Sequence, residues 1–246
     1  MDRLIYTAMT GAKQVAEQQT TVAHNLANVG SAGFRAQIDA FRAMPVPGGE
    51  KPTRAQVQSS TIAADFTPGT IQQTGRMLDV ALPDAGWLSV LGSDGREAYT
   101  RSGSLKVGPD GALITQSGLP VIGEAGPINL PPDTEITIAR DGSISALQPG
   151  IRPAVAEQVG RLKLVNPPAA DLARGDDGLF RLRNGADAEA DPAVRLESGA
   201  LEGSNVSVVD AMVRMIDLGR QFDTQMNLLK HADGNASKAD QVLSLN

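Results

Sequence analysis

The chain has 246 residues, of which 41% are hydrophobic and 20% charged, a composition typical of a folded protein. A net charge of −6 gives no general attraction to nucleic acid, and 3% aromatic residues are too few for a base-stacking or sugar-binding surface. The lack of cysteine excludes disulfides, thiolate zinc sites and cysteine nucleophiles, and two histidines are too few for a histidine-rich metal site.

The first thirty residues contain no proline and carry apolar side chains at alternating spacings of four and three residues. This spacing is typical of a coiled-coil seam and predicts a helix over about residues 2–29, within an N-terminal segment that we bound at 1–34. The seam positions are Met1, Ile5, Ala8, Ala12, Val15, Gln19, Val22, Leu26 and Val29.

The middle of the chain predicts an all-β domain rich in hairpins over residues 78–190. Residues 35–77 fit neither pattern well and are interpreted as a connecting region, and residues 191–204 as the return connection. Asp-Gly or Asn-Gly pairs between alternating runs are the strongest short hairpin signal. Five such pairs begin at Asp94, Asp110, Asp141, Asp177 and Asn184.

The last segment, residues 205–246, is again free of proline and predicts a helix that continues to about Leu243. Ser204 or Asn205 is expected to cap its start. Its seam positions are Val208, Met212, Met215, Gly219, Phe222, Met226 and Leu229, and the stripe is widened by Val209, Val213 and Ile216.

The expected fold is therefore mixed α and β, with N- and C-terminal helices paired as a coiled-coil-like domain beside the central β domain. Two amphipathic helices packed on a domain core are the ordinary alternative, but narrow seams suit helix–helix pairing better than packing on a sheet. With Ala8 and Ala12 in one seam and methionines in the other, such a pair is marginal alone, and partners from other chains can complete it.

Signatures of chemistry are missing from the sequence. It has no G-x-S-x-G elbow, no H-E-x-x-H motif and no P-loop, so we expect no enzyme activity, no cofactor and no metal. No apolar run approaches the ~18 residues of a membrane helix, and the N-terminus has no secretory-signal core. We therefore expect neither direct membrane insertion nor nucleic-acid binding.

One segment, Asn25-Leu26-Ala27-Asn28 followed by Gly33-Phe34-Arg35, has the physical character of a helix end. Asn28 tolerates a cap or left-handed position, and glycine releases the chain from the helix. We expect Gly33 to occupy a backbone angle or a close approach that a side chain cannot share. Phe34 is expected to be an apolar anchor whose packing matters mainly in an assembled state.

The same segment resembles the N-L-A-N-x-x-T-x-G-F signature of axial flagellar proteins, the rod and hook family, with Ala32 at the usual threonine position. The resemblance extends to Leu78–Ala81, Ala98–Gly103, Gly118–Gly123 and Leu201–Val206. Within the family, the segments Met1–Met9 and Met212–Phe222 are most similar to a proximal-rod member.

This resemblance implies a structural subunit of the flagellar basal-body rod, whose terminal helices form the inner domain of a hollow shaft that transmits torque. The implied partners are other rod subunits, copies of the chain itself and the flagellar type III export apparatus. It also implies export to the periplasm without a cleaved signal peptide.

Three other interpretations stay open at this stage. The chain could be a distal-rod member of the same family, or an intracellular coiled-coil adaptor with a β module. A β-rich hydrolase of cell-wall glycan would need two carboxylates in a groove, whereas Asp94, Asp110 and Asp141 stand in turns, where a structural role is expected.

Overall fold

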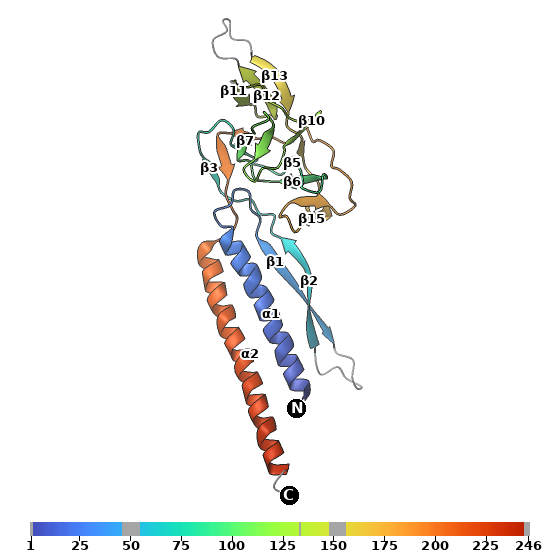
Figure 1. Cartoon of the computed structure of the whole chain (residues 1–246), viewed down its shortest axis with the longest axis vertical. Helices are drawn as coiled ribbons and strands as arrows, with labels where there is room; N and C mark the ends of the chain where they lie inside the picture. The colour runs from blue at the N-terminus through green and yellow to red at the C-terminus, as the bar shows by residue number, and fades with distance from the viewer. Residues whose placement is uncertain (1, 46–54, 133, 148–155, 244–246) are drawn as a thin grey trace. The chain divides into compact units, whose positions relative to one another are not determined.

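The computed structural model describes residues 2–45, 55–132, 134–147 and 156–243 (Figure 1). The chain divides into two compact units. The helical unit comprises Met1–Asn28, Gln37–Asp65 and Val206–Asn246, and the β unit comprises Val29–Ala36 and Phe66–Asn205. The backbone therefore passes between the two units after residues 28, 36, 65 and 205.

The helical unit contains two long helices, α1 (Asp2–Ala27) and α2 (Val208–Leu243). Ser207 caps α2, because its hydroxyl oxygen accepts a hydrogen bond of 3.4 Å from the backbone N–H of Asp210. The cap expected at Ser204 or Asn205 thus lies two to three residues further along the chain. Within the described residues, neither helix is long and apolar enough to cross a membrane.

The two helices pack side by side and antiparallel (Figure 1). Their shared core is formed by Val15 and Val22 of α1 and by Ala211 and Leu218 of α2. Further along, a side chain at Gly11 would contact Gln225, so α1 and α2 run in opposite directions along this contact.

The helical unit also contains a hairpin within the region interpreted from the sequence as a connection. Strands β1 (Gln37–Pro45) and β2 (Ala55–Ala64) pair antiparallel. The sequence pattern missed them because β2 is rich in Gln, Ser and Thr and neither strand alternates cleanly. The base of β1 is tied to α1, because the Thr21 hydroxyl donates a 2.8 Å hydrogen bond to Asp39.

The β unit is built from short antiparallel strands. Its largest sheet has five strands in the order β14-β5-β6-β16-β15, and a three-stranded sheet has the order β11-β12-β13. The remaining described strands form the pairs β3–β18, β4–β17, β7–β8 and β9–β10. The sheet strands are β5 (Trp87–Leu91), β6 (Glu97–Thr100), β11 (Glu135–Ile138), β12 (Ser143–Leu147), β13 (Ala156–Arg161), β14 (Leu164–Val165), β15 (Leu172–Arg174) and β16 (Phe180–Leu182).

The paired strands are β3 (Ile71–Gln73) with β18 (Ala200–Glu202), β4 (Val80–Ala81) with β17 (Glu197–Ser198), β7 (Leu105–Val107) with β8 (Leu113–Thr115), and β9 (Ile122–Gly123) with β10 (Gly126–Pro127). A single 3-10 turn, η1 (Ala169–Asp171), is the one helical element among the described residues of the β unit.

Four of the five predicted Asp-Gly and Asn-Gly turns join neighbouring strands. They connect β5 to β6, β7 to β8, β11 to β12 and β15 to β16, and each glycine has a positive φ. Gly185 also has a positive φ of 72° but lies after the last strand of its sheet. The central antiparallel character expected from the sequence is confirmed.

One contiguous apolar core fills the β unit, and its most deeply buried side chains come from many different strands and turns. They include Val80, Leu88, Val90, Leu105, Leu113, Val121, Ile144 and Leu162. The β unit therefore has an apolar core of its own.

Tyr99 predicts how the stability of this unit responds to high pH. Its hydroxyl oxygen accepts a 2.6 Å hydrogen bond from the backbone N–H of Ala188, and burial raises the pKa of the phenol from 10.0 to about 12. Because the unfolded chain loses this proton first, the free energy of unfolding should be unaffected below pH 10 and should fall between pH 10 and 12.

The measurement is urea unfolding followed by the fluorescence of Trp87, the only tryptophan of the chain, over this pH range. Tyr99→Phe should remove the added alkaline loss of stability. An equal alkaline loss in the variant would contradict the assignment to Tyr99.

Candidate functional site

The motif predicted from the sequence begins at the end of α1. The side chain of Asn25 pairs with the backbone of Gln37, donating to its carbonyl at 2.9 Å and accepting from its N–H at 2.8 Å. The side-chain amide of Asn28 donates a 2.9 Å hydrogen bond to the carbonyl of His24, which satisfies a carbonyl group in the last turn of α1. Leu26 is half-buried beside the α1–α2 core, and Ala27 is exposed.

Gly33 has the backbone geometry expected for it, with a φ of 67°. A Cβ at this position would lie 2.2 Å from the carbonyl carbon of Arg101, which no side chain can tolerate. The Gly33 N–H donates a 2.7 Å hydrogen bond to the carbonyl of Glu202. Glycine is thus required both by the left-handed backbone and by close approach to another strand.

Phe34 is an anchor, but its packing is complete in the single chain. Its ring is buried within the β unit, and the Arg174 guanidinium lies 4.7 Å above it. The same guanidinium donates a 2.8 Å hydrogen bond to the carbonyl of Arg35. The cost of removing this ring therefore falls on the β unit itself, which corrects the expectation that it is felt mainly on assembly.

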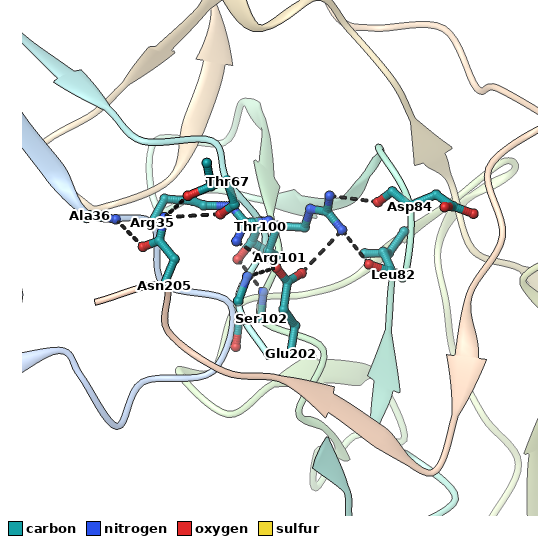
Figure 2. A network of polar contacts seen from close by, with 11 residues as sticks. Arg35, Ala36, Thr67, Leu82, Asp84, Thr100, Arg101, Ser102, Glu202 and Asn205 are labelled. Carbon is teal, nitrogen blue, oxygen red and sulfur yellow. Dashed lines mark hydrogen bonds and ion pairs between the residues drawn. The ribbon is translucent and has the colours of Figure 1, made fainter. Parts of the chain in front are cut away.

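A buried ion cluster lies directly after Phe34 and is formed by Arg35, Arg101 and Glu202, which we call the junction cluster (Figure 2). One carboxylate oxygen of Glu202 lies 2.6 Å from Arg35 Nη1 and accepts a 2.9 Å hydrogen bond from the N–H of Gly69. The other oxygen lies 3.2 Å from Arg101 Nη1. Arg35 and Glu202 are each only 1% exposed.

The junction cluster holds more positive than negative charge, because two guanidiniums share one carboxylate. The Arg101 guanidinium also donates hydrogen bonds to two backbone carbonyls, that of Leu82 at 2.7 Å and that of Asp84 at 2.8 Å. Burial lowers the pKa of Arg101, and the Glu202 carboxylate opposes that shift. Such a cluster contributes little net stability when intact but is costly to break, since removing one partner leaves buried charge without compensation.

Asn205 lies beside the junction cluster and binds two other segments at which the backbone leaves the β unit (Figure 2). Its side-chain oxygen accepts a 2.7 Å hydrogen bond from the N–H of Ala36, and its amide donates 3.1 Å to the carbonyl of Thr67. Its own N–H reaches the carbonyl of Phe34 at 3.4 Å. The segments through which the backbone leaves the β unit, near residues 36, 66 and 205, are therefore held together within that unit.

An aromatic cluster lies beside these contacts. The ring centroids of Trp87 and Phe180 are 4.7 Å apart, and Phe66 lies within 5.9 Å of both. Arg101 covers Trp87 at 5.6 Å, and Arg174 lies 5.9 Å from the Phe180 ring. Trp87 is thus a built-in fluorescence reporter of the junction cluster.

Sequence reasoning missed Arg35, Arg101 and Glu202 as partners. Each lies in a segment that carries the family resemblance. That placement was the one available signal, because pairing between residues so far apart in sequence leaves no local pattern.

The predicted seam of α1 is largely buried in the single chain. Ala8, Ala12, Val15 and Val22 are buried, and Leu26 is half-buried, as is Val29 in the β unit. Ile5 lies within α1, but its side chain is outside what the structure describes, and Met1 lies outside the described residues.

The contact of α2 with α1 uses a seam shifted from the one predicted. Met215, Phe222 and Leu229 are half-buried, as predicted for seam positions, but Val208, Met212 and Met226 are exposed. The buried positions of α2 are Ala211, Leu218 and Ala232. The helix therefore carries two adjacent apolar stripes, one against α1 and one facing solvent.

The turn aspartates do not have the environment of a glycosidase acid. The carboxylate of Asp94 accepts a hydrogen bond from the Arg96 N–H, and that of Asp141 accepts two from Ser143. These bonds lower the pKa of both carboxyls, whereas a general acid needs a raised pKa. Their geometry is that of turn-stabilising residues.

Comparison with known proteins identifies the class. The domain family described as "Flagellar hook protein FlgE/F/G D1 domain" matches residues 81–146, and "Flagellar basal body rod FlgEFG protein C-terminal" matches residues 197–242. Part of the β unit and most of the C-terminal helix are thus similar in sequence to domains of flagellar hook and rod proteins.

The chain is 52% identical to the flagellar basal-body rod proteins FlgF of Salmonella typhimurium and Escherichia coli, over the full length of all three chains. It is 30% identical to the rod protein FlgG of Borreliella burgdorferi, covering 98% of this chain and 99% of that protein. The chain belongs to the FlgF family of flagellar basal-body rod proteins. The family expected from the sequence motif is thereby confirmed.

Glu202→Gln tests the junction cluster. The amide keeps the size of the side chain and leaves two buried guanidiniums without a counter-charge, so we expect a loss of about 3–5 kcal/mol in the free energy of unfolding. The matched control is Glu124→Gln, because the Glu124–Arg161 pair at 3.5 Å is well exposed and should cost at most about 1 kcal/mol. Urea unfolding followed by Trp87 fluorescence measures both, and equal effects would contradict a special role for Glu202.

Gly33→Ala tests the close approach. The added methyl group clashes with the backbone of Arg101, so we expect a loss of more than about 2 kcal/mol in unfolding free energy. Gly30→Ala is the control, because a Cβ there meets nothing within 4 Å. It should change stability by less than about 0.5 kcal/mol. A Gly33→Ala chain as stable as the Gly30→Ala chain would show that the turn tolerates a side chain.

Proposed function

We propose that this chain is a structural, non-catalytic subunit of the proximal part of the flagellar rod, and that it assembles through its terminal helices. The observation that carries the proposal is the second apolar stripe of α2. Val209 is 70% exposed, and Met212, Val213 and Ile216 are each more than half exposed. A contiguous exposed row of large apolar side chains is typical of a protein interface.

The stripe adjoins the contact between α1 and α2. Val208 and Met212 are exposed, whereas Met215, one turn further along the same helix, is half-buried beside α1. A third helix laid along this side of α2 would extend the existing helix–helix contact. We infer that the helices of neighbouring subunits occupy it, with coiled-coil packing between heptad seams.

The junction cluster fits a shaft that carries torque. A rod subunit must transmit force between its parts without unfolding, and buried ion pairs with several fixed partners give a specific geometry. Glu202 and Asn205 hold together the chain segments that continue into the helical unit. We infer that this arrangement resists unravelling of the β unit from its ends.

The proposed partners are other rod subunits, copies of this chain and, during secretion, the flagellar type III export apparatus. The proposed location is the periplasmic part of the basal body, reached without a cleaved signal peptide. A chain without cysteine suits this route, because nothing in it can be oxidised to a wrong disulfide after export.

Two other candidates are weaker. A distal-rod role is disfavoured because identity to FlgG of Borreliella burgdorferi is 30% against 52% to the FlgF proteins. An intracellular adaptor is disfavoured by the same similarity to basal-body rod proteins. Detection of this chain in purified basal bodies, by antibody or mass spectrometry, separates the rod role from the adaptor.

Val213→Asp tests assembly through the stripe. Because Val213 is exposed in the single chain, the charge should leave unfolding of the monomer unchanged, but it should block incorporation into rods and abolish swimming. Gln221→Asp, also exposed on α2, is the control and should support swimming. The two readouts are urea unfolding of purified protein and motility of cells that carry only the variant chain. Normal swimming with Val213→Asp would contradict a buried stripe in the rod.

A further inference from the structure

Methionine supplies all the sulfur of this chain, which has seven methionines and no cysteine. Peroxides oxidise thiols and thioethers readily, and a thioether reacts where it is exposed. Among the described side chains, Met9, Met77, Met212 and Met226 are exposed, and Met212 is 51% exposed. The sulfur atoms of these side chains are therefore the places where a small oxidant acts on the free protein.

Met212 differs in its surroundings from the other exposed methionines of the two helices. On a helix, a side chain contacts those three and four residues away in either direction. All four of these positions around Met212 are apolar, namely Val208, Val209, Met215 and Ile216. By contrast, Met9 and Met226 each have a lysine four residues further along. An oxygen added to the sulfur of Met212 thus meets no polar side chain at the neighbouring positions of α2.

We propose that Met212 is a redox-sensitive modification site that controls entry of the chain into the rod, an inference that rests on the proposed rod function. Hydrogen peroxide transfers one oxygen atom to the thioether sulfur. An S–O bond forms, the O–O bond breaks, and the peroxide leaves as one molecule of water. The sulfur is oxidised by two electrons and the peroxide is reduced by two. The product is a polar sulfoxide in the middle of the exposed stripe of α2.

The sulfoxide affects assembly and leaves the free chain intact. On the monomer its oxygen is hydrated, because Met212 faces solvent. Against a neighbouring helix the same oxygen loses its water and gains no donor from the apolar side chains around it, which opposes the contact. Methionine sulfoxide reductases reverse the oxidation, so the modification is a switch and not only a lesion.

Peroxide treatment of cells tests the switch. Cells that carry the wild-type chain or Met212→Leu as their only copy form rods with and without sublethal hydrogen peroxide, and antibody quantifies the chain in isolated basal bodies. Leucine keeps the apolar character of the site and has no sulfur to oxidise. We expect peroxide to lower incorporation of the wild-type chain severalfold and to leave Met212→Leu at its own untreated level. Each chain is compared with itself, so damage to other rod components affects both equally.

A permanent mimic gives a second readout without any oxidant. Met212→Gln places a polar group of similar size in the stripe, and Met77→Gln is the matched control, because Met77 is 53% exposed and lies in the β unit. Both variants should unfold in urea like the wild-type chain. We expect Met212→Gln to be depleted from basal bodies and Met77→Gln to be incorporated and to support swimming.

Mass spectrometry of the purified, peroxide-treated chain locates the sulfoxides and should find one at Met212, with urea unfolding of the treated chain unchanged. Three outcomes would overturn the switch: no sulfoxide at Met212, equal effects of peroxide on the wild-type chain and Met212→Leu, or incorporation of Met212→Gln at the level of Met77→Gln. Each of them leaves the rod function intact as long as Val213→Asp is excluded from rods. Absence of the wild-type chain from basal bodies would instead contradict the proposed function itself.

Discussion

The carboxylate of Glu202 is the contact on which the rest of the structure depends. It lies between two buried guanidiniums, and the backbone of its own residue accepts the N–H of Gly33. Gly33 and Arg35 come from the segment after α1 and Arg101 from the loop after β6, whereas Glu202 itself lies in β18, the strand that leads toward α2. Because charge in the interior is tolerated only with its partners in place, the folded β unit requires these distant segments to lie together. The junction cluster thus determines which segments of the chain lie together in the β unit, more than it adds to the free energy of unfolding.

Local chemistry explains what the sequence could predict. An Asp-Gly pair dictates a turn through the glycine's own φ, so the hairpins at Asp94, Asp110, Asp141 and Asp177 were readable without any tertiary information. The two helices α1 and α2 were equally readable from local pattern, because both segments are free of proline and carry heptad spacing, although the cap of α2 is Ser207 rather than Ser204 or Asn205. The junction cluster was not predictable, because an arginine following a phenylalanine looks the same whether it is solvated or buried.

The register of the α2 seam could not be settled from the sequence for a different reason. The predicted seam and the seam that contacts α1 overlap on this helix and share Met215, Phe222 and Leu229. A search for apolar bulk favours the stripe that contains Val208 and Met212, whereas the contact with α1 uses Ala211 and Ala232. Small residues let two helices approach closely but carry little hydrophobic weight in a pattern. The larger residues are therefore left for a surface that the single chain does not cover.

This division of side chains has an energetic consequence. The β unit has a continuous core of deeply buried aliphatic residues, while the core that the described residues of α1 and α2 share is built around Val15, Val22, Ala211 and Leu218. Burial of apolar area is the main term that stabilises either unit. Burial of the apolar area that is still exposed would stabilise this helix pair further, and that area lies on the outer surface of α2. Val209, Met212, Val213 and Ile216, each more than half exposed, are where such burial is still available on α2.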